Sequence, residues 1–355
     1  MYPTDPELPI FFPQDELESH RLDHQHLALR MCLGHNYFGP LTQHLRHDPQ
    51  GVRKRVLDVG TGQGSWVQEM ATEFPDAEFI SLDVSPMAAH IPRENITFEV
   101  YDLYAGLAEP ASSFDVVHMR HMAFKVPNYP ALIRELHRVL KPGGLLLLGE
   151  LENEAYGAAD PDTPLGDAVP RLSRGLRLLR EALAAQGVMH DAGRRIPNIL
   201  ADADLFKPGS SSSYVFGTSS DSESSSGKSF SSIASSSASY SYFDAPVSSS
   251  VTSVSSASGS SSSPPGFVDI TFRTYPIPAT PWPNYLSSPA LHESGRQSMF
   301  AMRRGWPSLV PLLTTCVGLS ADDAHEVAHG ALADYFVNPS LRLVTNYHTT
   351  WAIKA

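Results

Sequence analysis

The sequence predicts an α/β fold in which helices cover both faces of a mostly parallel sheet. Three observations lead to this class: short apolar runs of strand length recur over residues 55–150, helix-like segments separate them, and a glycine-rich turn follows the first run. Strands that alternate with helices are typical of parallel sheets, because each crossover helix packs back onto a face of the sheet. A chain of 355 residues is long enough for one large domain of this kind or for two domains.

The first half of the chain contains most of the expected elements. Residues 16–45 have apolar positions at helical spacing and are interrupted at Gly34 and at Gly39-Pro40, which predicts two short helices. The strands that follow are expected near residues 55–59, 78–82, 96–100, 114–118 and 144–150, with helices near 64–74, 128–140, 165–187 and 195–203.

A serine-rich segment then interrupts this pattern. Between Ser210 and Ser263, 29 of 54 residues are serine. Such a segment cannot bury enough apolar surface to offset its ordering entropy, on the order of 1–2 kcal/mol per residue. We therefore expect a disordered insertion that is tolerated as a surface loop, because long flexible loops reduce stability only slightly. A phosphorylated regulatory loop, or one that binds a protein partner, is the alternative.

The expected fold resumes at Gly266. An apolar segment over residues 267–272 predicts a strand, and a proline-rich connection follows it through Trp282-Pro283. Two helices are expected near residues 291–303 and 320–336, and a last strand over Asn346–Lys354.

The glycine-rich turn is the strongest functional signal. The first expected strand ends in Gly60-Thr61-Gly62-Gln63-Gly64, and the second ends on Asp83. Glycines let the backbone approach a ligand and adopt positive φ without a Cβ clash. A carboxylate at the end of the second strand can accept hydrogen bonds from both hydroxyls of a ribose. Together these features predict a nucleoside-binding βαβ unit.

The residues around the turn distinguish between nucleoside cofactors. A dinucleotide site needs Gly or Ala where this chain has Ser65, and a P-loop needs a Lys that is absent here. Asp58, just before the turn, suits a cationic ligand better than a phosphate. S-adenosylmethionine carries an ammonium and a sulfonium beside its adenosine, so it is the better fit.

An ordered set of motifs over residues 55–150 resembles the class I S-adenosylmethionine-dependent methyltransferases. Asp58–Gly64 is similar to their first motif, residues 101–103 to their adenine-binding segment, residues 114–118 to their fourth strand, and Leu140–Leu145 to the turn before their fifth. The resemblance implies a Rossmann-like, seven-stranded, mostly parallel sheet whose last strand is antiparallel. It implies cofactor contacts at Asp58, Gly60, Gly62, Gly64, Asp83, Met87, Asp102, Leu103 and Arg120.

Shorter phrases are similar to the fungal LaeA-like group of secondary metabolism. They are Glu18-x-x-Arg21-Leu22-Asp23-x-x-His26, His118-Met119-Arg120 and Tyr347-His348-x-x-Trp351. That group includes regulators of metabolite production as well as small-molecule methyltransferases. The resemblance therefore implies methyl transfer to oxygen or nitrogen of a small organic acceptor. A regulatory or scaffold protein with weak or no turnover is the alternative.

The family resemblance also divides the chain into four parts. They are an N-terminal helical cap (1–50), a cofactor-binding core (51–207), the serine-rich insertion (208–265), and C-terminal strands and substrate-cap helices that complete the same domain (266–355). The substrate-binding part is then split between the two ends of the sequence.

Methyl transfer requires little of catalytic side chains. The sulfonium is already a good leaving group, so in-line alignment provides most of the acceleration. A base is needed only if the acceptor must lose a proton. The candidates at the expected mouth of the sheet are His118, His121, Glu150 and His26. Arg120 follows the fourth strand, where it could hold the cofactor carboxylate, shape the substrate wall or form a structural ion pair.

A rival motif lies near the C-terminus. His325-Glu326-Val327-Ala328-His329 matches the H-E-x-x-H pattern of zinc proteases. No Glu follows His329, and the longer H-x-x-G-x-x-H extension is absent because Gly330 directly follows that histidine. A third ligand is therefore lacking, and an ordinary surface helix without metal is favoured.

Composition excludes several other classes. The net charge of −12 argues against direct nucleic-acid binding, and arginines between Arg171 and Arg180 alternate with leucines as on an amphipathic helix. Cys32 and Cys316 allow no disulfide framework or cysteine zinc cluster. No signal peptide or apolar run of membrane-spanning length is recognisable. We expect a soluble intracellular protein, cytoplasmic or nuclear.

Overall fold

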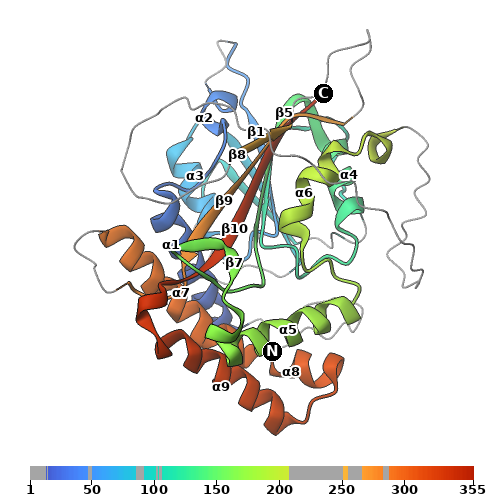
Figure 1. Ribbon diagram of the computed structural model, residues 1–355. Coiled ribbons are helices and arrows are strands. Elements are labelled where there is room, and N and C mark those ends of the chain that lie inside the picture. The colour runs from blue at the N-terminus through green and yellow to red at the C-terminus, as the bar shows by residue number, and fades with distance from the viewer. Residues whose placement is uncertain are drawn as a thin grey trace.

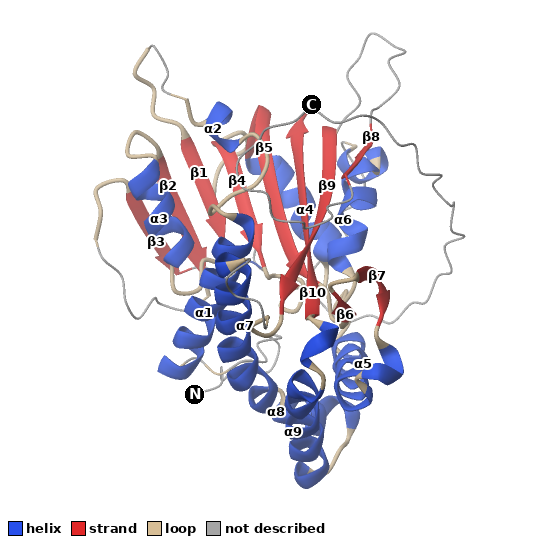
Figure 2. Cartoon of the chain, turned by 60° about the vertical axis from the view of Figure 1, so that its left-hand side comes forward, coloured by secondary structure: helices blue, strands red, loops and turns tan. Residues whose placement is uncertain are grey.

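The computed structural model describes residues 13, 15–46, 50–84, 92–100, 103, 106–207, 251–254, 266–282 and 288–355, with only the backbone for 251–254. A twisted sheet forms the centre, and a group of helices lies beyond one of its edges (Figures 1 and 2). The parallel strands are β1 (Arg55–Val59), β2 (Glu78–Asp83), β3 (Ile96–Val100), β4 (Phe114–Arg120) and β5 (Leu140–Leu151).

The strand order confirms the predicted class. The strands lie in the order β3-β2-β1-β4-β5-β10, and β10 (Leu343–Lys354) also pairs with β9 (Phe267–Pro278). β10 is antiparallel to both β5 and β9, as expected for the last strand. Among the described residues the sheet has ten strands, because three short strands that were not predicted extend it: β6 (Tyr156–Gly157), β7 (Asp160–Pro164) and β8 (Val251–Val254).

β8 lies within the segment that was expected to be a disordered insertion. Its sequence, Val-Thr-Ser-Val, is rich in β-branched residues, and it pairs antiparallel with β9. The strand was not predicted because the serine-rich composition of the whole segment outweighed the β preference of these four residues. The remainder of that segment lies outside the described residues.

Alternating side chains of the parallel strands enter two apolar layers. Val56, Val116 and Leu145 pack with α3 (Ser65–Glu73) on one face of the sheet. Leu57, Val117 and Leu146 pack on the other face with α4 (Tyr129–Val139) and α6 (Ala192–Ala201). This is the two-residue period of strands that are covered on both faces.

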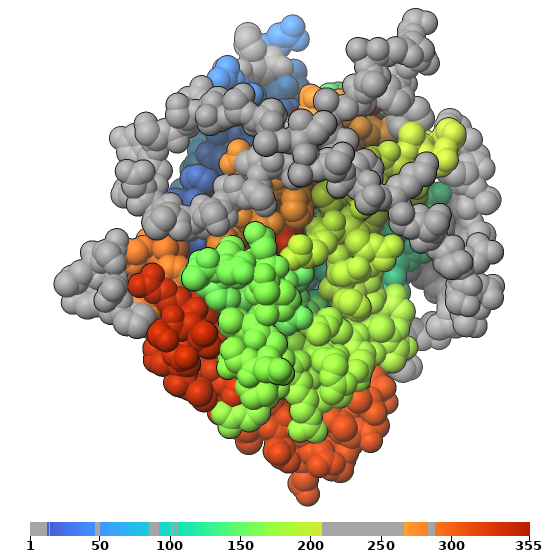
Figure 3. Space-filling view, viewed as in Figure 1, coloured from blue at the N-terminus to red at the C-terminus, as the bar shows by residue number. Residues whose placement is uncertain are grey.

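The other helices lie beyond the C-terminal ends of the parallel strands. α1 (Glu16–Leu33) and α7 (Pro289–Ser308) lie side by side there (Figure 2). A separate apolar cluster joins α5 (Pro170–Ala185), α8 (Val310–Leu312) and α9 (Ala321–Val337). The space-filling view shows α5 and α9 in contact on one face (Figure 3).

The predicted element boundaries differ from the observed ones mainly at strand ends. The first two predicted helices are α1, which ends at left-handed Gly34, and the single turn α2 (Leu41–His44). β5 begins four residues before the predicted start, and β9 continues six residues past the predicted end, to Pro278. Among the described residues, every helix is too short or too polar to cross a bilayer.

Candidate cofactor and acceptor site

The glycine turn is fastened to the end of the neighbouring strand β2. Gly60, Gly62 and Gly64 have φ values of 72°, 59° and 76°, the left-handed region that glycine adopts without strain. The Gly60 N–H donates to the Leu82 carbonyl at 2.9 Å, and the Gly62 N–H donates to Asp83 Oδ2 at 2.8 Å. The turn therefore lies beside the carboxylate that was predicted to hold the ribose.

Two side chains pack closely against the turn. A Cβ on Gly60 would overlap the sulfur of Met122, and one on Gly62 would approach Leu22 Cδ1 to 3.4 Å. Ser65 Oγ at the start of α3 donates to Asp23 Oδ1 of α1 at 2.7 Å. α1 therefore contacts the helix that follows the turn.

Asp58 is buried and has one oxygen without a partner. Its Oδ1 lies 2.7 Å from His118 Nδ1, and the His118 ring stacks on Trp66 at a centroid distance of 3.7 Å. Asp58 Oδ2 is buried and accepts no hydrogen bond in the structure. Burial lowers the pKa of His118 even though the Asp58 hydrogen bond acts to raise it. An unsatisfied buried carboxylate oxygen costs free energy, so it identifies a place for a cationic or N–H donor group.

Arg120 lies in a chain of polar contacts beneath α1. Its Nη2 donates to His26 Nδ1 at 2.9 Å, and His26 Nε2 lies 3.4 Å from Glu69 Oε2. The hydrogen bond from His26 is the largest contribution that lowers the Glu69 pKa to about 2. Within the described part of the chain, no carboxylate comes within 4.0 Å of the half-buried Arg120 guanidinium. The predicted roles of Arg120, in the cofactor site, in the substrate wall or in a structural ion pair, stay predictions.

The predicted adenine contacts are only partly described. Leu103 is partly buried against the apolar layer that contains α4 and α6. Met87 and Asp102 lie outside the described residues. Their roles stay predictions.

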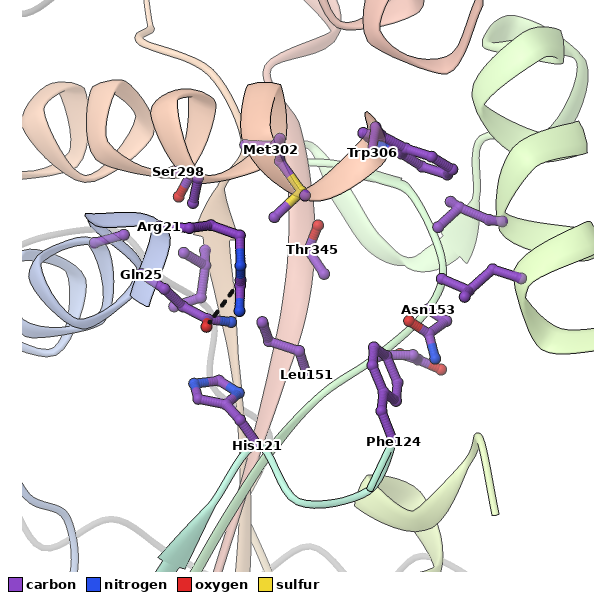
Figure 4. A pocket seen from close by; sticks show the side chains of 18 of the residues that line it. Arg21, Gln25, His121, Phe124, Leu151, Asn153, Ser298, Met302, Trp306 and Thr345 are labelled. Carbon is purple, nitrogen blue, oxygen red and sulfur yellow. Dashed lines mark hydrogen bonds between the residues drawn. The ribbon is translucent and has the colours of Figure 1, made fainter. Parts of the chain in front are cut away.

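A largely apolar pocket opens beyond the C-terminal ends of β4 and β5 (Figure 4). The residues that line it come from helix α1, the turns after β4 and β5, helix α5, helix α7 with its neighbours in β9 and β10, and Tyr335 of α9. The residues labelled in Figure 4 are Arg21, Gln25, His121, Phe124, Leu151, Asn153, Ser298, Met302, Trp306 and Thr345. Leu22 lines this pocket and also faces Gly62, so the pocket adjoins the glycine turn.

Two of the four predicted candidates for a base line this pocket. His121 and Glu150 are at its wall, whereas His118 is engaged by Asp58 and His26 by Arg120 and Glu69. His121 has a φ of 55°, and its N–H donates to the carbonyl of Gly149 at 2.9 Å. Burial, and next the positive charge of Arg120, hold the His121 pKa well below its ordinary value, so the imidazole is neutral.

Glu150 ties the turn after β4 to β5. Its Oε1 accepts a hydrogen bond from the Met122 N–H at 3.0 Å and another from the Tyr129 hydroxyl at 2.9 Å. Its side chain is buried, and this burial raises its pKa to about 7 in spite of these donors. The carboxyl group can therefore gain or lose a proton near neutral pH.

Most charges around the pocket are already paired. Arg21 forms a two-pronged contact with Glu18, with both N···O distances 2.6 Å. Burial would raise the Glu152 pKa, but hydrogen bonds from His348 and Arg194 outweigh it and hold the pKa at about 2. The walls therefore present little unbalanced charge to a ligand.

Sequence reasoning missed most of the residues that line the pocket. Arg21 belonged to a quoted phrase, but Phe124, Asn153, Met302 and Trp306 carried no signal of their own. Asn153 Nδ2 is buried without a hydrogen-bond partner, a property that only three-dimensional contacts reveal. These residues meet because segments far apart in sequence converge at the C-terminal ends of the parallel strands.

The H-E-x-x-H motif lies on α9, away from this pocket. The His325 and His329 rings are 6.2 Å apart. No group of three His, Cys, Asp or Glu side chains in the described ranges is arranged to hold a metal ion. Both histidines are exposed on α9.

Comparisons with known proteins match part of the chain to a known family. Residues 26–195 match the family model described as a methyltransferase domain. This part of the chain is similar to methyltransferase domains, and the similarity supports S-adenosylmethionine as the cofactor. A "Secondary metabolism regulator laeA" of Coprinopsis cinerea is 35% identical over 146 residues, 41% of this chain and 36% of that protein.

Other relatives are named as enzymes. "Methyltransferase pytC" of Aspergillus terreus is 34% identical over 167 residues, which cover 46% of this chain and 48% of that protein. A phosphoethanolamine N-methyltransferase structure from Haemonchus contortus aligns with a TM-score of 0.40 at 15% identity, covering 92% of this chain and 56% of that one. The chain spans roughly a third to a half of the length of the two sequence relatives.

Proposed function

We propose that this protein transfers a methyl group from S-adenosylmethionine to a small organic acceptor. The observation that carries the proposal is the contact between the glycine turn and the largely apolar pocket at Leu22, which brings a donor site and an acceptor site together. The bound cofactor supplies an electrophilic methyl group on sulfur. The protein then has to align the acceptor with that methyl group and exclude water.

The geometry supports specific roles for the cofactor residues. Asp58 Oδ2 offers an unsatisfied buried oxygen to the cofactor ammonium. Arg120, a cation without a carboxylate partner among the described residues, would hold the cofactor carboxylate. Gly60, Gly62 and Gly64 allow close backbone approach, and Asp83 would accept the ribose hydroxyls. Leu103, Met87 and Asp102 remain the proposed adenine contacts.

The acceptor proposal rests on the pocket and on the relatives. The walls are mainly apolar, and the charges in them are mostly paired, which suits a small uncharged organic molecule better than a peptide or nucleic acid. Relatives named for secondary metabolism point to an acceptor from such a pathway, methylated at oxygen or nitrogen.

A regulatory protein on a methyltransferase fold is the second candidate. The relative from Coprinopsis cinerea is named as a secondary metabolism regulator. In such a protein the cofactor would still bind, but small-molecule turnover would be weak or absent.

Replacement of Asp83 by Ala tests the cofactor site. The change removes the ribose acceptor and the anchor of the Gly62 N–H, so we expect S-adenosylmethionine affinity to fall roughly 10- to 100-fold by calorimetry. Asp162→Ala, on the exposed strand β7, is the matched control and should bind normally. Equal affinity of Asp83→Ala and the intact protein would reject the assigned site.

A labelling experiment separates the enzyme from the regulator. An extract of the source organism is incubated with methyl-labelled cofactor and either the intact protein or Asp83→Ala. Label in a discrete small molecule, seen only with the intact protein, is the expected result. Label only in proteins would overturn the small-molecule acceptor.

A further inference from the structure

We propose that His121 binds the hydroxyl group of an uncharged, largely apolar acceptor and receives its proton during methyl transfer. This inference rests on the proposed function and assigns both a residue and a substrate class to the same pocket. Four features support it: the backbone of His121, its unpartnered ring, its charged neighbours and the chemistry of the opposite wall.

His121 is held in a backbone conformation that non-glycine residues rarely adopt. Its φ of 55° is stabilised by the hydrogen bond to the Gly149 carbonyl and by the Glu150 carboxylate, which binds the next N–H, that of Met122. Such strain persists only where the surroundings enforce it, and it occurs preferentially at functional sites. Glu150 is therefore a positioning residue for His121.

The His121 ring lacks a hydrogen-bond partner within the described part of the protein. Its Nε2 is buried and unpaired, while the ring lies 5.5 Å from that of Tyr347. In contrast, the buried rings of His118 and His348 are each hydrogen bonded through Nδ1. An unpaired buried polar atom is destabilising, so a ligand group that hydrogen bonds the ring would gain affinity from it.

The charges around His121 keep its imidazole neutral and able to accept a hydrogen bond. The groups that face it are Arg120, Arg21, Lys125 and His118, which lower its pKa, together with Tyr347 and Glu150 nearby. These neighbours make the ring a weak base. The positive charge of Arg120 would also stabilise negative charge that develops on an acceptor oxygen.

The opposite wall indicates the class of acceptor. Asn153 lies across the pocket from His121, next to Phe124 (Figure 4), and its Nδ2 is a buried donor without a partner. Between the two polar groups the wall is apolar, with Leu151 and Met302 facing the cavity. An aromatic or otherwise flat hydroxylated molecule with a second oxygen acceptor matches this arrangement.

The transfer step balances without any further reagent. The acceptor oxygen forms a bond to the methyl carbon, and the carbon–sulfur bond breaks with its electron pair remaining on sulfur. The hydroxyl proton passes to the His121 imidazole and then to solvent. Because the oxygen becomes strongly acidic as the carbon–oxygen bond forms, a weakly basic imidazole suffices.

A pair of simple probes tests the hydrogen bond independently of turnover. 2-Naphthol and its methyl ether differ only in the hydroxyl group, and their binding is followed by fluorescence in the presence of saturating S-adenosylhomocysteine. We expect the intact protein to prefer the naphthol roughly three- to tenfold. His121→Phe should lose this preference and keep its affinity for the ether.

Two further variants make the result decisive. His121→Asn tolerates positive φ and should also lose the preference, which separates the imidazole from its backbone strain. His329→Phe, at an exposed position of α9 that does not line the pocket, should retain it. An unchanged preference in His121→Phe, with normal cofactor binding by calorimetry, would overturn the role of His121. Absence of cofactor binding in the intact protein would instead reject the proposed function.

Discussion

Glu150 makes the stability of the folded protein depend on pH. Its pKa is raised by burial from 4.5 to about 7. Between these values the folded state retains a proton that the unfolded state releases, so the free energy of unfolding decreases as pH rises through this window. The full effect above pH 7 is about 3 kcal/mol.

Glu150→Gln should remove this contribution. The free energy of unfolding is measured with denaturant at pH 5 and at pH 8 for both proteins. We expect the intact protein to lose about 3 kcal/mol more than the variant between these two pH values. Glu99→Gln, at an exposed position of β3, is the control. Identical pH responses of Glu150→Gln and the intact protein would contradict the raised pKa.

At the residue scale, the sequence predicted which polar residues belong to the site better than it predicted their hydrogen-bond partners. Asp58 and His118 were both named as site candidates, but their contact depends on the register of β1 against β4, which places the two residues opposite each other. The strand spacing alone does not determine that register. The lack of a partner for the His121 ring likewise depends on every neighbouring segment.

At the scale of elements, the position of α7 depends on one small residue, Gly295. A Cβ on Gly295 would overlap the backbone carbonyl of Thr280, which cannot move aside as a flexible side chain would. α7 also packs along α1 and contributes Met302 and Trp306 to the pocket. The close approach at Gly295 therefore sets one wall of the acceptor site.

Gly295→Ala should destabilise the protein by about 1–3 kcal/mol in denaturant unfolding, because backbone must shift to accept the methyl group. Gly305→Ala on the same helix is the matched control, since its nearest neighbour outside the helix, Arg21 Cδ, is 3.7 Å away. The control should gain up to about 1 kcal/mol from the better helix propensity of alanine. Equal stabilities of the two variants would show that the α7 contact is adaptable.

The sequence predicted which segments form helices or strands more reliably than it predicted which of these elements pack against one another. The parallel strands follow from buried apolar runs, and the helices from their spacing. The amphipathic pattern of α5 correctly predicts a buried leucine face, yet it does not reveal that α9 covers that face. For the same reason the pocket between α1, α5 and α7 could not be predicted.

On the scale of the whole molecule, the residues on either side of segment 208–265 lie close together. The ring of Phe206 packs against that of Phe267 at 5.3 Å, and a Cβ on Gly266 would lie 2.7 Å from Phe206 Cδ2. The two ends of the segment are therefore already neighbours.

Replacement of residues 208–265 by a short glycine–serine linker of about six residues should preserve the fold and cofactor affinity. Shortening the loop favours folding by about 2 kcal/mol, from which the lost pairing of β8 with β9 is subtracted. Thermal unfolding and calorimetry with S-adenosylmethionine check this. A shortened protein that no longer binds cofactor would show that the segment belongs to the site.

The position of β10 inside the sheet limits the order in which parts of the chain can fold during synthesis. This strand, the last along the described chain, lies between β5 and β9, and α1 from the other end of the sequence packs on α7. Until residues near 350 emerge, the edges of β5 and β9 remain unpaired and available to wrong partners. The pocket, which Thr345 of β10 helps to line, therefore cannot be complete until β10 has been synthesised, after a period in which chaperones would be of most use.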